Sequence, residues 1–274
     1  MHVWMPDYFI PIARRSLPKS SRLLLRPFSD HAKFNKNFPG RISMHQLHTN
    51  LATHMVDHAF SLLCNKAVED KHKDYLYINV DDVDISKFDL PQKYVVVCPG
   101  FTAITREWLP KSLNETVSYI REKGYPVIFL GNENTSDGLK GAIKANFNDK
   151  IDYSKGINLL NKTTIEESTK IIYNSKCVVG LDCGLGHLGN THPTLPIVMG
   201  YSNVEPKYRM GYRNGIMGKY YYPIVASQNN PCQFCQSTNV FTFNHDFKWP
   251  LYPESPCNYD LTSDLYIEQL KKIL

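Results

Sequence analysis

The chain lacks the features that mark several classes of protein. No run of about 18 apolar residues occurs in its 274 residues, so we expect no membrane-spanning helix. Residues 1–7 include no basic region followed by an apolar stretch, which argues against a secretory signal and favours a cytoplasmic protein. The sequence also lacks internal repeats and low-complexity segments, so repeat architectures are not expected.

Charge of one sign is not strongly in excess either. The net charge is +5, 21% of the residues are charged, and the basic residues are scattered rather than gathered into one patch. This balance allows an anionic partner but does not require one, so nucleic-acid binding is only weakly supported. With 42% hydrophobic residues, the chain can bury the core of an ordinary globular protein.

From residue 94 onward, strand and helix patterns alternate. Short apolar runs predict strands over 94–98, 126–131, 157–160, 177–182 and 195–200. Amphipathic patterns predict helices over 112–123, 164–175 and 262–274. Gly124 suits the end of the first helix, and Thr163 or Thr164 suits the start of the second. Alternation of this kind predicts βαβ units and a mostly parallel sheet.

The first 90 residues show a different pattern. Short runs at 3–5, 22–25 and 75–80 are strand-like, and a capping box at 43–46 predicts the start of a long helix. The polar stretch 81–92 reads as a linker. We therefore expect two lobes, over 1–90 and 91–274, of which the first is short or truncated.

Two segments place polar groups directly after predicted strands. Residues 100–110 contain Thr102, Thr105, Arg106 and Trp108. The hydroxyls and the guanidinium can bind phosphate oxygens, and the indole can pack on a base or brace the loop. An ordinary connecting loop with a buried tryptophan is the alternative interpretation.

The second segment, 180–188, reads as a buried strand that opens onto a glycine-bearing turn and a helix start. It carries Asp182, Gly184, Leu185, Gly186 and His187. Ligands of open α/β sheets bind at the carboxyl ends of the strands, and a helix start there favours anionic groups such as a diphosphate.

Together these segments resemble glycosyltransferase family 9, the lipopolysaccharide heptosyltransferases and their relatives in the GT-B superfamily. The ordered elements are Pro-Gly-x-Thr with a basic residue, Trp and Pro, then Gly131-Asn132-Glu133, residues 159–164, and Asp182-Cys183-Gly184-Leu185-Gly186-His187-Leu188. The corresponding family strings are Lys-x-Trp-Pro, Leu-x-Gly-x-Thr and Asp-Ser-Gly-x-x-His-Leu. Arg106 stands where the family has Lys, and Cys183 where it has Ser.

The resemblance implies an α/β, GT-B-like fold with two Rossmann-like lobes and mostly parallel sheets. It implies an inverting transfer of a sugar from a nucleotide diphosphate-sugar, with ADP favoured, to a hydroxyl of a glycan or lipid-linked saccharide. No cofactor would be required for catalysis, and His187 would also stabilise the diphosphate by donating from a ring nitrogen. The implied donor-binding residues are Thr102, Thr105, Arg106, Trp108, Asn132, Glu133, Asp182, Gly184, Leu185, Gly186 and His187.

The general base is less well defined. The family has an aspartate in an N-terminal Gly-Asp loop, and the nearest candidate here is Asp7, with an ordinary surface aspartate as the alternative. The predicted N-terminal helix carries four histidines that could contact the acceptor or act as base, or simply form a polar face: His45, His48, His54 and His58. If no base is present, nucleotide-sugar binding without catalysis is the alternative function. Transfer to a modified base in DNA is another.

The seven cysteines fall into two groups. Four lie in or beside apolar segments and are expected to be buried: Cys64, Cys98, Cys177 and Cys183. The others, in an irregular proline-rich segment, form a Cys-x-x-Cys pair and a later cysteine that accompany a histidine: Cys232, Cys235, His245 and Cys257. These four could hold a structural zinc ion that makes the segment an interaction module, form a disulfide, or leave the thiols free.

Overall fold

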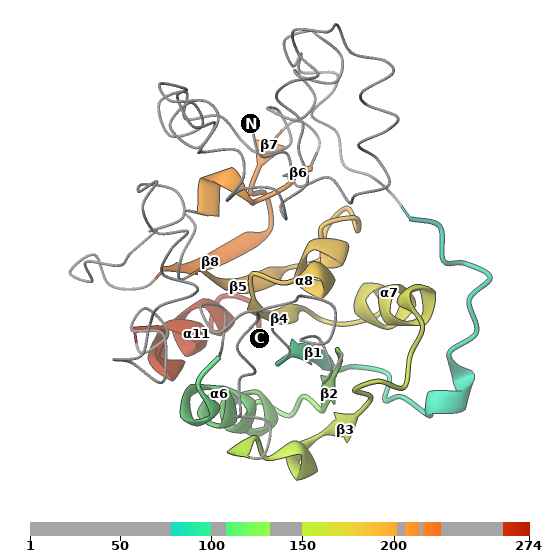
Figure 1. Cartoon of the computed structure of the whole chain (residues 1–274), viewed down its shortest axis with the longest axis horizontal. Coiled ribbons are helices and arrows are strands. Elements are labelled where there is room, and N and C mark those ends of the chain that lie inside the picture. The colour runs from blue at the N-terminus through green and yellow to red at the C-terminus, as the bar shows by residue number, and fades with distance from the viewer. Residues whose placement is uncertain (1–77, 100–107, 132–149, 202–205, 214–215, 226–259) are drawn as a thin grey trace, which may run out of the picture.

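A computed structural model describes residues 78–99, 108–131, 150–201, 206–213, 216–225 and 260–274 of the chain (Figure 1). Their centre is a six-stranded sheet in which every neighbouring pair is parallel, with the strand order β3-β2-β1-β4-β5-β8. The strands are β1 (Val95–Cys98), β2 (Val127–Phe129), β3 (Ile157–Asn158), β4 (Val178–Leu181), β5 (Ile197–Tyr201) and β8 (Tyr221–Val225). This is the doubly wound Rossmann order, which reverses direction between β1 and β4.

Helices cover both faces of the sheet (Figure 1). The helices are α6 (Pro110–Glu122), α7 (Ile165–Tyr173), α8 (Gly184–Gly189) and α11 (Ser263–Leu270). Short 3-10 turns form η3 (Ser86–Phe88), η6 (Tyr153–Lys155) and η7 (Pro206–Tyr208), and β6 (Tyr212–Arg213) pairs with β7 (Ile216–Met217) in a small antiparallel hairpin. No helix in these stretches is long and apolar enough to cross a membrane.

Alternation along the strands divides the core in two. In β1, Val95 and Val97 pack into the cluster that contains α6 and α11, whereas Val96 and Cys98 pack into the cluster that contains α7. All four residues are 0–2% exposed, which explains why the strand reads as an uninterrupted apolar run. The sheet is therefore buried on both faces, and its polar chemistry is confined to its edges.

Local signals in the sequence place the ends of the helices. Thr164 caps α7, because its side chain accepts from the Glu167 N–H while the Glu167 carboxylate accepts from the Thr164 N–H. Gly124 follows α6 with φ +82°, a conformation that favours glycine. The predictions for these two helices are confirmed, with Thr164 rather than Thr163 as the cap.

The predicted linker packs against this sheet. Ile85, Phe88 and Leu90 contact the α7-side cluster, and the Lys87 ammonium lies 2.6 Å from the Glu167 carboxylate. A strand was predicted over 75–80. Residues 78–80 form no strand, so the prediction is wrong for these three residues. The boundary between lobes at residue 90 stays a prediction, because residues 1–77 lie outside the description.

Candidate functional site

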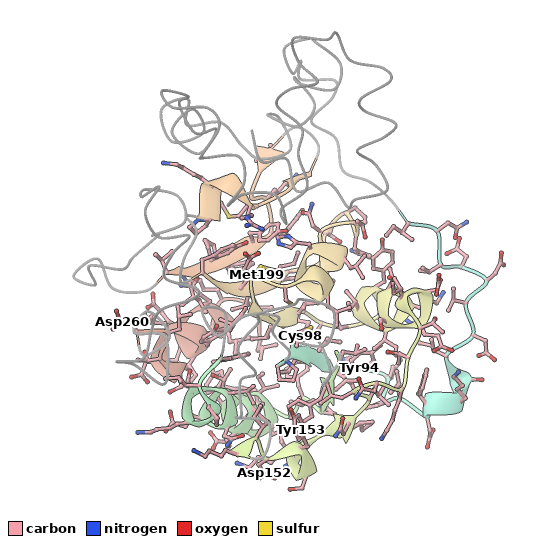
Figure 2. The ribbon with its side chains drawn as sticks, in the orientation of Figure 1. Tyr94, Cys98, Asp152, Tyr153, Met199 and Asp260 are labelled. Carbon is pink, nitrogen blue, oxygen red and sulfur yellow. The ribbon has the colours of Figure 1, made fainter. Side chains whose placement is uncertain are left out.

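The carboxyl ends of β1 and β4 lie side by side at the point where the strand order reverses. Cys98, which is labelled in Figure 2, pairs with Gly180 in the parallel register, and β4 ends at Leu181. Asp182 and Cys183 follow immediately, and α8 begins at Gly184. In doubly wound sheets this position is where ligands bind.

Asp182 is the centre of the polar groups at this edge. Its side chain is 3% exposed, and its N–H donates to the Gly200 carbonyl on β5. One carboxylate oxygen, Oδ1, lies 2.8 Å from Nε2 of His187, and the other, Oδ2, lies 3.8 Å from Nη1 of Arg209. A buried carboxylate therefore holds two cation-forming side chains, each partly exposed, at one point.

The contact with Asp182 determines which atom of His187 can face a ligand. Because Nε2 is engaged by the carboxylate, only Nδ1 remains for another partner. A neutral ring with its proton on Nε2 presents an acceptor at Nδ1, whereas a ring with both protons presents a donor. The resemblance to family 9 implies that His187 donates to a phosphate oxygen. With Nε2 engaged by Asp182, such donation requires the doubly protonated ring.

Arg209 is a site residue that the sequence analysis missed. It follows η7, in the connection between β5 and β8, and its N–H donates to the Pro206 carbonyl. No local motif marks it. The signal that could have found it is the fold itself, because the β5–β8 connection must pass over the edge that carries Asp182.

The two glycines of the turn, Gly184 and Gly186, have different surroundings. A Cβ on Gly186 would lie 2.1 Å from the Met199 Cε, so a side chain there would have to displace the end of the Met199 side chain. A Cβ on Gly184 would meet nothing within 4 Å, and this residue is exposed. Gly186 is thus closely packed against Met199, whereas Gly184 leaves its backbone open at the edge of the sheet.

Trp108 does not offer a face to a ligand. It is 1% exposed, its ring stacks on Tyr266 with centroids 4.2 Å apart, and its Nε1–H donates to the Ser112 hydroxyl. Ser112 in turn donates to the Leu261 carbonyl, which ties α6 to the segment before α11. The prediction that Trp108 contacts the donor is therefore corrected, and its alternative, bracing the structure, is what the contacts show.

The predicted thiol environments also need one correction. Cys98 and Cys177 are buried, as expected, but Cys183 is partly exposed because the chain leaves the core after β4. The remaining cysteine of that group, Cys64, lies outside the described residues.

The structure brings together Asp182, Gly184, Leu185, Gly186 and His187, and adds Arg209. Many other predicted residues fall outside the described parts of the chain: Asp7, His45, His48, His54, His58, Thr102, Thr105, Arg106, Asn132, Glu133, Cys232, Cys235, His245 and Cys257. Within the described parts, no group of three or more His, Cys, Asp or Glu side chains could hold a metal ion.

The sequence and the fold are similar to those of known proteins. The sequence model of "Glycosyltransferase family 9 (heptosyltransferase)" matches residues 40–219, about two thirds of the chain. The chain belongs to glycosyltransferase family 9. No curated protein sequence matches it.

Two solved structures illustrate the similarity. The iron-containing heptosyltransferase TibC, solved in complex with ADP-D-beta-D-heptose, has a TM-score of 0.59 at 15% identity, over 82% of this chain and 54% of TibC. The E. coli ADP-heptose lipopolysaccharide heptosyltransferase II has a TM-score of 0.47 at 16% identity, over 73% of this chain and 53% of its own. This family 9 chain thus spans about half the length of the structures it matches. The TibC similarity and the parallel sheet confirm the predicted α/β, GT-B-like fold class.

Proposed function

We propose that this family 9 chain binds an ADP-linked sugar and transfers the sugar, with inversion, to a hydroxyl of a glycan or lipid-linked saccharide. The observation that carries the proposal is the buried Asp182 carboxylate holding His187 and Arg209 at the point where the strand order reverses. TibC, which has a similar fold, was solved with ADP-D-beta-D-heptose, and this supports ADP as the nucleotide.

The chemistry follows from what the leaving group needs. In an inverting transfer, the acceptor oxygen attacks the anomeric carbon from one side while the bond to the diphosphate breaks on the other, so negative charge grows on the diphosphate. Fixed cations and backbone N–H groups stabilise such charge without a metal ion. His187, Arg209 and the open backbone at Gly184 would supply them, and Asp182 would hold both cations in place.

Residues outside the described parts complete the proposal. Thr102, Thr105 and Arg106 follow β1, whose carboxyl end neighbours Asp182, so they would reach the same diphosphate. Asn132 and Glu133 follow β2 and would contact the nucleoside. The base that removes the acceptor proton would be Asp7 or one of the N-terminal histidines.

Nucleotide binding is the first test. A thermal-shift series with ADP, UDP, GDP, CDP and dTDP, and with ADP-heptose, should give the largest rise in Tm for the ADP compounds. Arg209→Gln should weaken ADP binding about tenfold or more, since it removes the guanidinium that the proposal places at the diphosphate. Arg121→Gln is the matched control. Arg121 is exposed in the last turn of α6, whereas the start of α6 is the end that follows β1 and the site. Folded protein that responds to no nucleotide would overturn the proposal.

Turnover distinguishes an enzyme from a binding protein. With ADP-heptose and a saccharide acceptor, the proposal expects release of ADP and a product with inverted anomeric configuration, detected by NMR. Donor that binds but is neither transferred nor hydrolysed would favour the non-catalytic alternative. Transfer to a modified base in DNA would redirect the acceptor assignment.

We also propose that Cys232, Cys235, His245 and Cys257 hold one structural metal ion. Thiolate and imidazole donors suit zinc or iron, and TibC is described as iron-containing. Elemental analysis of the purified chain should find about one metal ion per chain, lost in Cys232→Ser. Metal-free protein with these cysteines oxidised or freely alkylated would contradict the proposal.

A further inference from the structure

The last residue of β5, Tyr201, is a buried tyrosine whose hydroxyl has no hydrogen-bond partner among the described residues. The residue is 0% exposed and packs with Ile197, Met199 and Tyr221. Most buried hydroxyls in proteins are hydrogen-bonded, because a buried hydroxyl without a partner destabilises the native chain. The position of this hydroxyl therefore needs an explanation in terms of what it could bind.

The strand register sets Tyr201 beside Asp182. Leu181, the residue before Asp182, pairs with Gly200, the residue before Tyr201. The Asp182 N–H donates to the Gly200 carbonyl, which continues the pairing of β4 with β5 by one residue beyond Leu181. Neighbouring strands lie about 4.8 Å apart, a distance that a tyrosine side chain spans.

The side chains of Asp182 and Tyr201 lie on the same face of the sheet, the face that α8 covers. Asp182 contacts His187 of α8. Met199, two residues before Tyr201 on β5, reaches Gly186 of α8 with the end of its side chain. Because residues two apart in a strand share a face, Tyr201 also projects on the α8 side. The Tyr201 side chain and the Asp182 carboxylate are thus neighbours in one layer.

The two oxygens of the Asp182 carboxylate have different contacts. Oδ1 lies 2.8 Å from Nε2 of His187, whereas Oδ2 lies 3.8 Å from Nη1 of Arg209, which is longer than a hydrogen bond. In the proposed function the Arg209 guanidinium also faces the donor diphosphate, which competes with Asp182 for this cation. The carboxylate is 3% exposed, and a buried carboxylate whose cation is drawn away is stabilised by another hydrogen-bond donor.

We propose that Tyr201 is a positioning residue for Asp182 in the donor-bound chain, where its hydroxyl donates to Oδ2 while Arg209 engages the diphosphate. The inference rests on the proposed function. Burial raises the pKa of Tyr201 well above its ordinary value, so the hydroxyl keeps a proton to donate at neutral pH. The hydroxyl then has its partner only when the donor is bound, and it keeps Asp182 ionised and in contact with His187.

Tyr201→Phe tests the proposal because it removes only the hydroxyl. Without nucleotide, the urea midpoint of the variant should equal or exceed that of the native chain, since the hydroxyl has no partner to lose. The affinity for ADP should nevertheless fall about tenfold, because a hydrogen bond to a carboxylate is lost in the bound state. Urea denaturation and isothermal titration calorimetry on the full chain measure the two quantities.

Tyr94→Phe is the matched control. Tyr94 is also buried, but its hydroxyl donates to the Ile171 carbonyl at 2.8 Å, and it precedes the amino end of β1, at the opposite edge of the sheet from the site. This variant should show the reverse pattern, with a lower urea midpoint and an unchanged affinity for ADP. The pair of variants therefore separates a hydroxyl that acts in the bound state from one that stabilises the fold.

A double-variant comparison tests whether Tyr201 acts through Asp182 or contacts ADP itself. In a chain that carries Asp182→Ala, adding Tyr201→Phe should cause no further loss of ADP affinity, because the acceptor is already absent. If Asp182→Ala does not fold, Asp182→Asn replaces it. A neutral acceptor forms a hydrogen bond about half as strong, so the effect of Tyr201→Phe should then shrink to about threefold or less.

NMR provides a spectroscopic test on the native chain. With tyrosine labelled with ¹³C at Cζ, the Tyr201 signal is the one that is absent from Tyr201→Phe. It should shift when ADP is added, because the hydroxyl acquires an acceptor, whereas the Tyr94 signal should stay in place.

Three results would overturn the positioning role while leaving the proposed function intact. They are native ADP affinity in Tyr201→Phe, a lowered urea midpoint of that variant without ADP, and a full tenfold further loss when Tyr201→Phe is added to the Asp182 variant. If the native chain binds no ADP, the proposed function fails, and the positioning role fails with it.

Discussion

The two ends of strand β4 carry cysteines in opposite environments. Before the amino end, Cys177 is fully buried among apolar side chains, and burial raises its pKa to about 12. After the carboxyl end, Cys183 is only partly buried and lies between β4 and α8. The same residue type is therefore fully buried at one end of the strand and partly exposed at the other.

The difference arises from how the backbone is satisfied at each end. At the amino end, the Lys176 and Val178 N–H groups donate to the Tyr94 and Pro196 carbonyls, and among the described residues no buried charged side chain lies there. At the carboxyl end, the chain turns into a short helix, and Asp182 stands beside side chains that come from α8 and from the β5–β8 connection. Side chains from α8 and from the β5–β8 connection therefore meet the Asp182 carboxylate at this end.

The largest expected effect comes from removing the charge at the carboxyl end. Asp182→Asn keeps the shape of the side chain but no longer attracts His187 and Arg209. We expect kcat/KM with ADP-heptose to fall about 100-fold, because the cations would no longer be fixed where charge develops on the diphosphate. Steady-state kinetics with saturating acceptor measures this loss.

The matched control is Asp152→Asn. The Asp152 carboxylate accepts a backbone hydrogen bond from the Ser154 N–H at the start of η6, and Figure 2 places Asp152 away from Cys98. It should leave kcat/KM unchanged. Equal losses in both variants, or none in Asp182→Asn, would mean that Asp182 has no special role in the reaction.

The second prediction concerns packing beside Asp182. A Cβ on Gly200 would lie 2.2 Å from the Tyr266 hydroxyl and 2.9 Å from Leu181 Cδ2, both well inside contact distance. Gly200→Ala should therefore lower the free energy of unfolding by about 2–3 kcal/mol, as overpacking of a rigid core does. Urea denaturation followed by tryptophan fluorescence measures it. Gly184→Ala, where a Cβ meets nothing within 4 Å, is the control and should cause no loss.

The sequence predicted what is encoded locally. Strands buried on both faces read as apolar runs, so β1, β2, β4 and β5 were found, as was the turn that carries Asp182. Strand β8 was missed because Pro223 interrupts its pattern; it lies at the edge of the sheet, where a missing N–H is tolerated.

What depends on distant contacts could not be predicted in the same way. Trp108 was expected to contact the donor because nothing near it in the sequence shows that Tyr266, from the last helix, covers its ring. Arg209 reaches Asp182 only through the path of the β5–β8 connection.

A third prediction compares serine substitutions at the two ends of β4. Cys177→Ser places a hydroxyl in an apolar, fully buried position, so the free energy of unfolding should fall by about 1–2 kcal/mol. Cys183→Ser restores the residue of the family motif at a helix cap that serine suits, and should change stability by less than about 0.5 kcal/mol. Urea denaturation of both variants under reducing conditions provides the comparison. Equal losses in the free energy of unfolding for Cys177→Ser and Cys183→Ser would show that the surroundings of the two residues do not differ in polarity.

The smallest effect on stability is expected at Thr164, a residue on the carboxyl edge of the sheet that has a structural role only. Thr164 follows β3 and caps α7 through its reciprocal hydrogen bonds with Glu167. Thr164→Ala should lower the free energy of unfolding by about 1 kcal/mol. Thr164→Ser should keep the free energy of unfolding close to that of the native chain, because serine caps helices equally well. Neither should change ADP affinity, since Thr164 lies beyond β2 from the meeting point of β1 and β4. If Thr164→Ala weakened ADP binding while Thr164→Ser did not, the ADP site would extend along the carboxyl edge of the sheet as far as β3. Ligand binding would then be a property of the whole carboxyl edge rather than of its centre, where β1 and β4 meet.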